Sequence, residues 1–430
     1  MKKNLSMPGM LNACRSNFIQ QESKLPCSSP FSWSDCLTSG LAIFSLKLPS
    51  LLQFEQQKCD EVLDHNLKTL YGVQSVPSDT TLRERLDRVN PNDLHPCFSK
   101  IFSFLQRSKH LEAYQYYQGK YLISIDGTGY FSSHTVHCDS CCVKNHKDGK
   151  KTYYHQALSG ALVHPMIKQV IPLPPEPILA QDGSKKNDCE LNAAKRFLKR
   201  LRRDHPNLDL IVVEDAIYAN GPHISLLKEL SMNFILSVKP SSHKWLFEYL
   251  DACDVAEYTY VDNDNVTHCF RYCNNVPLNY ANDDIRVNFL EYVETSPNGK
   301  QRKFSWATDF VLTEKNVYTI MRGGRSRWKI ENETFNTLKN QGYNFEHNFG
   351  HGYQYLSTVF MNLMMLAFLI DQVQEMTCSF FSKALKSAKR RTYLWKKIDG
   401  YITHYFINSW EHLYEAIADK RKPRVVLDTC

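Results

Sequence analysis

The chain has 430 residues, a net charge of +7 from 52 Lys and Arg against 45 Asp and Glu, and 43% hydrophobic residues. This length and composition exclude a disordered chain and a small disulfide-stapled scaffold, and they leave room for two or three domains. The 14 cysteines are irregularly spaced, which favours a reducing, cytoplasmic compartment. The first residues lack the apolar run of a secretion signal. The net charge permits nucleic-acid binding without requiring it.

The first 118 residues are expected to form a helical region. An amphipathic run follows Ser78, with Leu82, Leu86 and Val89 on one face, and a second helix is expected over Phe98–Gln106. Small helical units of this kind often bind DNA. A plain helical lobe is the alternative.

Strands dominate the next part of the chain, residues 119–240. The expected elements are strands at Tyr121–Ile125, Tyr153–His164 and Gln169–Leu173, a helix at Glu190–Arg203, a strand at Leu208–Val213, a helix at His223–Leu230 and a strand at Asn233–Val238. Three strands therefore precede the alternation of helix and strand. This order predicts an α/β fold with a ribonuclease H-like mixed sheet flanked by helices.

The remaining chain divides into three parts. Residues 241–312 are β-prone, polar and rich in turns, so we expect a β-rich insertion there. Residues 313–376 are expected to complete the core, with a helix over Arg325–Asn340 and another over Tyr355–Met376. The longest apolar stretch, Leu356–Ile370, is shorter than the ~20 residues that span a bilayer, so we expect a buried helix and no membrane contact. Residues 377–430 form a basic helical tail.

Two aspartates are predicted to meet at one edge of the sheet. Asp126 is expected to end the first strand, where Gly127 turns the backbone away. Asp215 ends the fourth strand, and a parallel neighbour of the first strand places it beside Asp126. Carboxylates in this position are typical ligands of two divalent cations roughly 3.5–4 Å apart.

A third carboxylate is expected from the helix over Arg325–Asn340. At 100° per residue, Glu331 lies within about 80° of Phe335 and Leu338, whereas Glu333 lies about 160° away. A carboxylate on an apolar face is costly unless it is paired or bound to a metal. Glu331 is therefore the predicted third ligand.

Two other phosphoryl-transfer chemistries are disfavoured. Phosphatases that form an aspartyl phosphate carry Asp-x-Asp-Gly-Thr, and Ser124 replaces the first, nucleophilic Asp of that motif here. The sequence also lacks a GxxxxGK phosphate-binding loop, so nothing supports an NTPase.

Three segments in this order, IDGT, VVEDAIYANGPHI and RSRWKIENETFNTLKNQGYNFEHNFGHG, resemble bacterial insertion-sequence transposases of the DDE class. The resemblance covers roughly Tyr121–Gln372, in the group with a β insertion and a Tyr-Arg-Glu-Lys signature. It implies that Asp126, Asp215 and Glu331 are the catalytic triad and hold two Mg²⁺ or Mn²⁺ ions. Arg327 and Lys339 match the Arg and Lys of the signature.

The chain departs from that signature at two places. Gly324 stands where the Tyr would precede Arg327, and Lys339 follows Glu331 by eight residues instead of seven. The first departure removes any DNA contact that the Tyr would make. The second shifts the Lys by about 100° around the helix.

The resemblance implies a DNA transposase that cleaves transposon ends and transfers them to target DNA. Its partners would be double-stranded DNA, as transposon ends and as target, and a second copy of the chain in a synaptic homodimer, in the bacterial cytoplasm at the nucleoid. A ribonuclease H-like DNA nuclease without strand transfer and a catalytically silent DNA-binding relative are the alternatives.

Further DNA contacts are expected from basic and aromatic residues around the triad. The candidates are Lys195 and Arg196 of the KRFLKRLRR run, Arg325, Arg327, Lys339 and Trp306. A solvated helix face is the alternative for the basic run, and a buried side chain is the alternative for Trp306. The tail, with Lys383 to Lys397 interleaved with aromatic residues, is also expected to contact DNA.

A short loop between the first two strands carries a cysteine pair. Cys138 and Cys141 have the spacing of a zinc knuckle, but no second CxxC follows, so histidines would complete a Zn²⁺ site. His146 is the first candidate, and His134, His137 and His155 are the others. Free thiols in a hairpin loop are the alternative. Asp188 and Glu190 are expected only to cap the helix that follows them.

Overall fold

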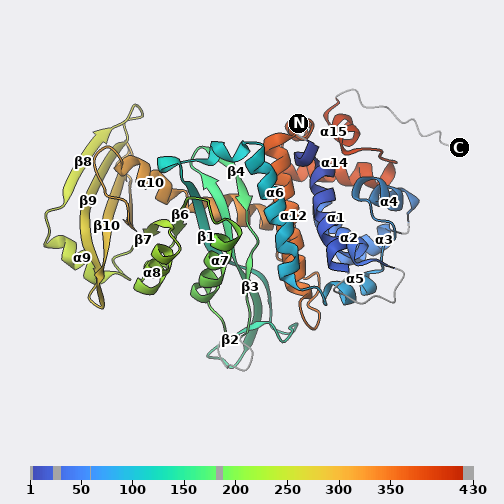
Figure 1. The fold of residues 1–430 in the computed structure, drawn as a ribbon, viewed down its shortest axis with the longest axis horizontal. Helices are drawn as coiled ribbons and strands as arrows, with labels where there is room; N and C mark the ends of the chain where they lie inside the picture. Colours follow the sequence, from blue (N-terminus) through green and yellow to red (C-terminus); the bar gives the residue numbers. More distant parts are fainter. Residues whose placement is uncertain (1–2, 23–30, 59, 181–186, 420–430) are drawn as a thin grey trace.

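The computed structural model describes residues 3–22, 31–58, 60–180 and 187–419. The molecule is elongated, with helices of both chain ends gathered at one end, a mixed sheet in the middle and an antiparallel group of strands at the other end (Figure 1). This arrangement confirms the predicted α/β class, in which helices flank a large mixed sheet.

One sheet runs through the structure, in the order β2-β3-β1-β6-β7-β11-β10-β9-β8, with β4 and β5 also paired to β3. The strands are β1 (Tyr121–Ser133), β2 (Cys142–Asn145), β3 (Lys151–His164), β4 (Ile167–Pro172), β5 (Glu176–Ile178), β6 (Leu210–Glu214), β7 (Asn233–Ser237), β8 (Ala256–Val261), β9 (Thr267–Asn279), β10 (Asn282–Thr295) and β11 (Gln301–Thr308). The antiparallel strands β1, β3 and β4 lie beside the parallel series β1, β6 and β7. This arrangement agrees with the ribonuclease H-like core that the order of elements along the chain predicted.

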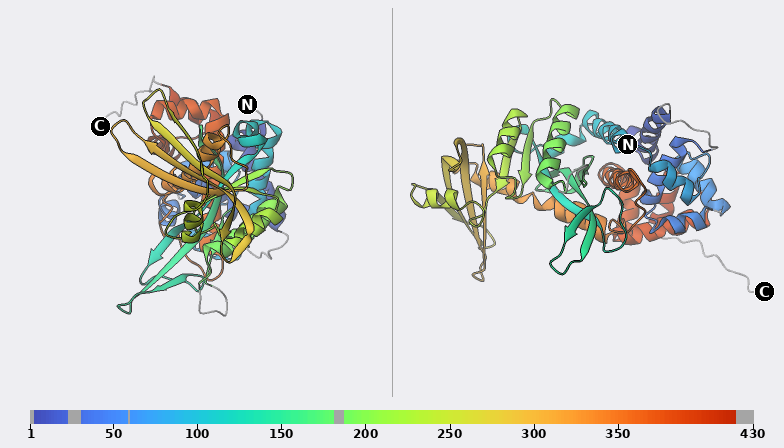
Figure 2. Two further views of the ribbon diagram at one scale, coloured as in Figure 1. Left: turned by 90° about the vertical axis from the view of Figure 1, so that its left-hand side faces the viewer. Right: turned by 90° about the horizontal axis from the view of Figure 1, so that it is seen from below.

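Helices cover both faces of this core. The helices between and after its strands are α7 (Glu190–Asp204), α8 (Gly221–Glu229), α9 (Lys244–Asp251), α10 (Val317–Arg325), the π-helical turn η6 (Ile330–Phe335) and α11 (Asn336–Asn340). Helices α7 and α8 lie on one face, whereas α10 and η6 cross the other (Figure 2). The β-strand core is apolar on both sides, and all five residues of β6 are buried.

The β-rich insertion extends the core sheet. Strand β11 pairs antiparallel with β7, so that Trp306 lies opposite Ser237 and Thr308 lies opposite Ile235. The sequence predicted an insertion over residues 241–312, and the strands within it continue the hydrogen-bond ladder of the core outward to β8.

Strands β1 and β3 are longer than the parallel strands beside them. Their register runs from Leu122 opposite Val163 to Ser133 opposite Tyr153, well past the end of the pairing with β6. Together with β2 they form an arm that projects away from the sheet, most clearly in the views of Figures 1 and 2. We refer to residues 127–158 as the β arm.

The helical end of the molecule combines both ends of the chain. Its elements are η1 (Lys3–Leu5), α1 (Met7–Glu22), α2 (Trp33–Ser45), α3 (Leu51–Gln57), α4 (Glu61–Asn66), η2 (Leu67–Tyr71), α5 (Asp79–Leu86), η3 (Pro91–Leu94), α6 (His95–Arg107), η4 (His110–Tyr114), η5 (Tyr117–Gly119), α12 (Leu356–Thr377), α13 (Ser379–Ala388), α14 (Arg391–His404) and α15 (Trp410–Ala418). The helices predicted around Leu82 and over Phe98–Gln106 are α5 and α6.

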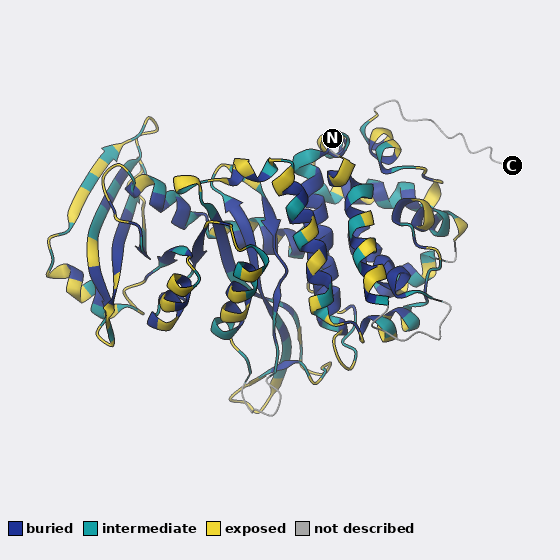
Figure 3. Ribbon diagram, in the orientation of Figure 1, coloured by how far each residue is buried: buried dark blue, intermediate teal, exposed yellow. Residues whose placement is uncertain are grey.

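Helix α12 lies at the centre of this end, between the sheet and the N-terminal helices (Figure 3). It has 22 residues and contains an 18-residue window with a mean hydropathy of 1.6, which are the length and composition of a membrane span, but 94% of that window is buried inside the protein. The expected buried helix is confirmed, and each end lies within one residue of the predicted Tyr355–Met376. Polar residues near its C-terminal end, such as Asp371 and Gln374, are also buried and paired.

The N-terminus of α12 is capped by a residue from the N-terminal region. Oδ1 of Asp87 accepts hydrogen bonds from the backbone N–H groups of Gln354, Tyr355 and Leu356, and Oδ2 accepts one from Tyr353, at 2.8–3.0 Å. A carboxylate at this end of a helix satisfies free N–H groups and favours the helix dipole. This contact ties the first helices to the core.

A buried ion pair makes a second tie. Lys47 Nζ lies 2.7 Å from Asp371 Oδ2, and Tyr343 donates a 2.6 Å hydrogen bond to the same carboxylate oxygen. Nζ also lies 4.2 Å from the ring centre of Trp395. Burial lowers the pKa of Lys47 and raises the pKa of Asp371, and in each case the partner's charge opposes the shift. The charged form of each residue is therefore stabilised by the charge of the other.

We predict that Asp371→Ala lowers the free energy of unfolding by about 3–5 kcal/mol, because it leaves the Lys47 ammonium buried without a carboxylate. The double variant Lys47→Met/Asp371→Leu should lose much less, since both charges are removed. Urea unfolding followed by circular dichroism measures both effects. Asp64→Ala, which breaks the exposed pair with Lys68, is the control and should change stability by less than about 1 kcal/mol. Equal losses in the single and double variants would contradict this account.

Candidate active site

Two aspartates lie at the same edge of the parallel strands. Strands β1 and β6 pair from Tyr121 with Leu210 to Ser124 with Val213, and Asp126 and Asp215 each follow the last pair by two residues. One feature of the prediction was wrong. Asp126 does not end β1, and Gly127 does not turn the backbone away, because the strand continues in its antiparallel pairing with β3. The aspartates are adjacent because β6 ends, not because β1 does.

Arg327 joins two of the predicted triad residues. Its Nη1 lies 3.1 Å from Asp126 Oδ2 and 2.7 Å from Glu331 Oε1. The side chain of Arg327 is mostly buried, whereas that of Glu331 is 47% exposed. A single guanidinium nitrogen therefore holds carboxylates from the central strand and from the crossing helix in one cluster.

Ser124 fixes the backbone that carries Arg327. Its hydroxyl is fully buried in β1 and donates a 2.8 Å hydrogen bond to the carbonyl oxygen of Arg327. The expected helix over Arg325–Asn340 is interrupted here, since α10 ends at Arg325 and the next regular element is η6. Ser124, whose presence disfavours a covalent aspartyl mechanism, thus positions the backbone of Arg327.

Glu331 lies in the π-helical turn η6 (Ile330–Phe335), and Lys339 lies in α11, which follows it directly. In a π-helical turn the backbone hydrogen bond spans one more residue than in an α-helix, so a single turn absorbs one extra residue. This explains how the eight-residue spacing fits into a helix where the signature has seven. It also means that the assumption of 100° per residue was wrong for this segment. Lys339 itself lies 2.8 Å from Glu346.

A fourth carboxylate, Glu190, belongs to the cluster. It is the first residue of α7, and a Cβ atom added to Gly127 would overlap its carboxylate. The expectation that Asp188 and Glu190 cap this helix was wrong, because the N-cap is Cys189, without a side-chain hydrogen bond, and Asp188 pairs with Arg196. In the sequence, the signal for this contact was Gly127, because a residue without a side chain leaves room for the Glu190 carboxylate.

Burial and like charges raise the pKa of these carboxyl groups. The pKa of Asp126 rises to about 7 through burial, and Glu331 and Glu190 add to the rise while Arg327 opposes it. The pKa of Glu190 is raised by burial and by Asp215, and the nearby Tyr218 hydroxyl partly offsets this. Such crowding is typical of a functional site.

Tyr218 lies beneath the cluster. Its side chain is fully buried, and burial followed by the charges of four carboxylates raises its pKa. One of these is Glu214, which is also fully buried and lies 2.7 Å from His223 Nε2. Glu214 therefore belongs to a separate buried pair, as expected for a side chain on the opposite side of the strand from Asp215.

The cluster fits the predicted divalent cations by its chemistry. Carboxylate oxygens from Asp126, Asp215, Glu331 and Glu190 are the hard ligands that Mg²⁺ and Mn²⁺ prefer. Burial, and then the charges of Glu331 and Glu190, raise the pKa of Asp126, and a bound cation would stabilise the charged carboxylates.

A groove beside the cluster is lined by basic and aromatic residues. It has a volume of about 410 Å³, and its lining includes Asp215, Lys239, Lys303, Arg325, Arg327 and Trp328. Lys239 Nζ lies 3.9 Å from Asp215 Oδ2. Positively charged side chains of the groove thus lie next to the sheet edge where the carboxylates meet.

Trp306 fills the place beside Gly324. Trp306 is only 2% exposed, and a Cβ atom on Gly324 would lie 2.5 Å from its indole Nε1. Gly324, where the signature has Tyr, therefore makes room for Trp306. As placed, Trp306 is packed in the floor of the groove, in agreement with the alternative of a buried side chain. The exposed aromatic residue at this groove is Trp328, at 52%.

The other basic candidates differ in whether their charges are paired within the protein. Arg325 Nη1 is 2.7 Å from Glu294 Oε2 at the groove. Lys195 is exposed on α7. Arg196 is paired with Glu176 at 2.6 Å and with Asp188 at 2.7 Å, so its charge is used within the fold.

The cysteine pair has one of the histidine candidates, His155, as a neighbour, together with His351, which was not among them. Cys138 and Cys141 gather with His155 and His351. His146 instead lies 2.7 Å from the Thr152 hydroxyl, away from this cluster. His351 could not be chosen from the sequence, because it follows Cys141 by 210 residues.

The transposase DDE domain matches residues 118–369, more than half of the chain. The chain belongs to this family. It is a DNA transposase, and the family consists of enzymes that act on DNA. No curated relative matches the chain.

Solved structures provide one further comparison for this DDE transposase. A cryo-EM structure of the piggyBac transposase synaptic complex with hairpin DNA is 12% identical, with a TM-score of 0.41, and the match covers 99% of this chain and 86% of that one. The family assignment rests on the domain match.

We predict that Gly324→Ala destabilises the transposase by about 1–3 kcal/mol, because the new methyl group overlaps the Trp306 indole. Gly400→Ala is the matched control. It lies in α14 with nothing within 4 Å of the added atom, and it should stabilise by about 0.5–1 kcal/mol. Thermal unfolding distinguishes the two. If Gly324→Ala were as harmless as the control, the packing of Trp306 on Gly324 would be wrong.

Proposed function

We propose that this transposase uses Asp126, Asp215 and Glu331 to cut transposon ends and to join them to target DNA. The observation that carries the proposal is the convergence of these carboxylates, with Glu190, at the edge of β1 and β6. Two Mg²⁺ ions, or Mn²⁺, held by these carboxylates would activate the attacking oxygen and stabilise the leaving 3′ oxygen.

The protein's own residues would orient the reacting groups. Asp126 and Asp215 are fixed on the rigid central strands, and Glu331 is held on the crossing helix through Arg327. Arg327 lies between two carboxylates and can shift toward a phosphate oxygen as DNA enters. Among the residues of this cluster that the structure describes there is no serine, threonine or cysteine, so the attacking groups would be water and then the freed 3′ hydroxyl.

We further propose which surfaces receive the DNA. The groove with Lys239, Lys303 and Arg325 would follow the phosphate backbone, and Trp328 is placed to stack on a base near the cut. Lys195 and Lys339, together with the helical regions 1–118 and 377–430, would hold the transposon end. Because one site serves two DNA substrates, we propose a homodimer in the synaptic complex, in the bacterial cytoplasm at the nucleoid.

The central test uses DNA that carries the inverted repeats flanking the reading frame, a target plasmid and Mg²⁺. Asp126→Asn, Asp215→Asn and Glu331→Gln should each reduce end cleavage by roughly a thousand-fold or more, because each removes several kcal/mol of transition-state stabilisation. The matched control is Glu333→Gln, two residues from Glu331 and not among the charges that act on Asp126. It should retain near-normal cleavage.

The products of this reaction discriminate among the alternatives. Cleavage followed by joining to the plasmid supports the transposase mechanism. Cleavage without joining would indicate a ribonuclease H-like nuclease. DNA binding without Mg²⁺-dependent cleavage would indicate a catalytically silent relative and would overturn the proposed triad.

Glu190 provides a separate prediction. We expect Glu190→Gln to raise the Mg²⁺ concentration needed for half-maximal cleavage by roughly ten-fold, because residues that support metal ligands tune metal affinity. Titrating Mg²⁺ against the cleavage rate measures this change, with Glu333→Gln as the reference. An unchanged Mg²⁺ dependence would show that Glu190 lies beside the site without taking part in it.

A further inference from the structure

We infer that Cys138, Cys141, His155 and His351 form a structural Zn²⁺ site that fastens the β arm to the segment before α12. The four side chains come from three parts of the chain: the loop before β2, strand β3, and the loop that follows α11. Cys141 and His155 are buried, and the other two are partly buried. The site is separate from the carboxylate cluster and does not depend on the proposed function.

The distances match those of a tetrahedral site with two sulfur and two nitrogen ligands. With Zn–S near ~2.3 Å and Zn–N near ~2.05 Å, a regular tetrahedron has edges of roughly 3.8 Å between sulfurs, 3.6 Å between sulfur and nitrogen, and 3.3 Å between nitrogens. The observed distances are 3.7 Å for the two Sγ atoms and 3.2 Å between His155 Nε2 and His351 Nδ1.

Three of the four sulfur-to-nitrogen distances are close to the tetrahedral value as well. His155 Nε2 lies 3.4 Å from Cys138 Sγ and 3.3 Å from Cys141 Sγ, and His351 Nδ1 lies 3.9 Å from Cys141 Sγ. All four ligand atoms lie within 4.8 Å of one another. Two thiols and two imidazoles pointing at one centre are the donor set of many closed structural zinc sites.

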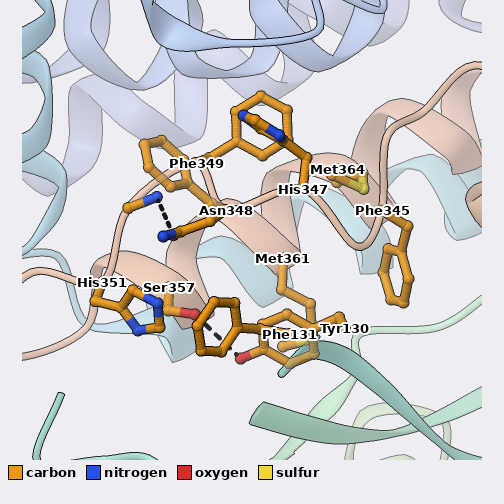
Figure 4. A pocket seen from close by; sticks show the side chains of 12 residues that line it. Tyr130, Phe131, Phe345, His347, Asn348, Phe349, His351, Ser357, Met361 and Met364 are labelled. Carbon is orange, nitrogen blue, oxygen red and sulfur yellow. Dashed lines mark hydrogen bonds between the residues drawn. The ribbon is translucent and has the colours of Figure 1, made fainter. Parts of the chain in front are cut away.

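Groups around the ligands hold them in place. The backbone N–H of Cys138 donates to Cys141 Sγ at 3.4 Å, a contact that favours a thiolate. The His155 ring stacks on Tyr130, and the edge of the His351 ring meets Phe131, with centroids 4.2 Å apart. Figure 4 shows His351 beside Phe131 and Ser357 at the rim of an aromatic pocket.

The backbone around His351 is shaped for this position. Gly350 and Gly352 flank it with φ of +134° and +65°, values that side chains other than glycine rarely adopt. Gly352 also leads into the residues that Asp87 caps. On the other side, His155 pairs with Phe131 of β1, five residues beyond Asp126. Bound zinc would therefore cross-link β3, the antiparallel partner of the strand that carries Asp126, to the loop before α12.

The test measures metal in the purified full-length protein. Zinc content by mass spectrometry should be about one ion per chain in the presence of excess Mg²⁺, which occupies oxygen-ligand sites. Cys141→Ser and His351→Ala should lose this zinc. His146→Ala, at the histidine that directly follows β2 and lies outside the cluster, is the matched control and should keep it.

Co²⁺ provides a spectroscopic test of the geometry. Co²⁺-substituted protein should show sulfur-to-metal charge transfer and the intense visible bands of a tetrahedral site, which a carboxylate site does not give. His351→Cys should retain one metal ion and show stronger charge transfer, because it adds a third sulfur ligand. This variant tests the site even if His351→Ala fails to fold. Exchange of hydrogen in residues 345–356 should rise when the zinc is removed by a chelator.

Three results would overturn the inference. One is wild-type protein that takes up no Zn²⁺ or Co²⁺ under reducing conditions. Another is His351→Ala protein whose Co²⁺ spectrum and zinc content equal those of the wild type. The third is a Cys138–Cys141 disulfide, found by mass analysis, in protein that carries no metal.

Discussion

The parallel pairing of β1 with β6 is the constraint on which the site depends. It places Asp126 and Asp215 at one edge, at a depth where water only partly screens their charges. Everything packed against that edge responds to this negative charge. Arg327 reaches it from the crossing helix, Ser124 fixes the backbone of Arg327, and Gly127 leaves space for a further carboxylate from α7. The fold thus concentrates charge that a cation can balance.

Much of this arrangement could be predicted from local rules. An aspartate after a buried strand is visible as a pattern, because it depends only on neighbouring residues. The prediction that Glu331 lies on the apolar face of an α-helix was wrong, since its side chain is 47% exposed and the segment is π-helical. The continuation of β1 past Asp126 was missed, since a DG pair usually turns, and the long pairing with β3 outweighed that preference. Glu190 was missed because a carboxylate at a helix start has a simple local explanation. Its partners are distant in sequence.

The same limit applies to the cysteine loop and to the helix with Glu331. Spacing indicated Cys138 and Cys141, but the choice between His146 and His351 depends on how the β arm packs against α12. The π-helical turn likewise had no local signal, although it explains why Lys339 is displaced by one residue. Both features result from packing between segments that the chain brings together only after folding. Local sequence rules carry no information about them.

The continuous ladder from β6 through β7 and β11 to β8 has a mechanical consequence. A module joined by two flexible linkers could swing freely on DNA, whereas one that shares backbone hydrogen bonds with the core must move with it. Force applied to the distant strands would reach the strand next to Asp215 through hydrogen bonds that are loaded in shear and break together. The insertion is therefore rigidly coupled to the core. If DNA were bent across it, the resulting force would strain the edge where the carboxylates lie.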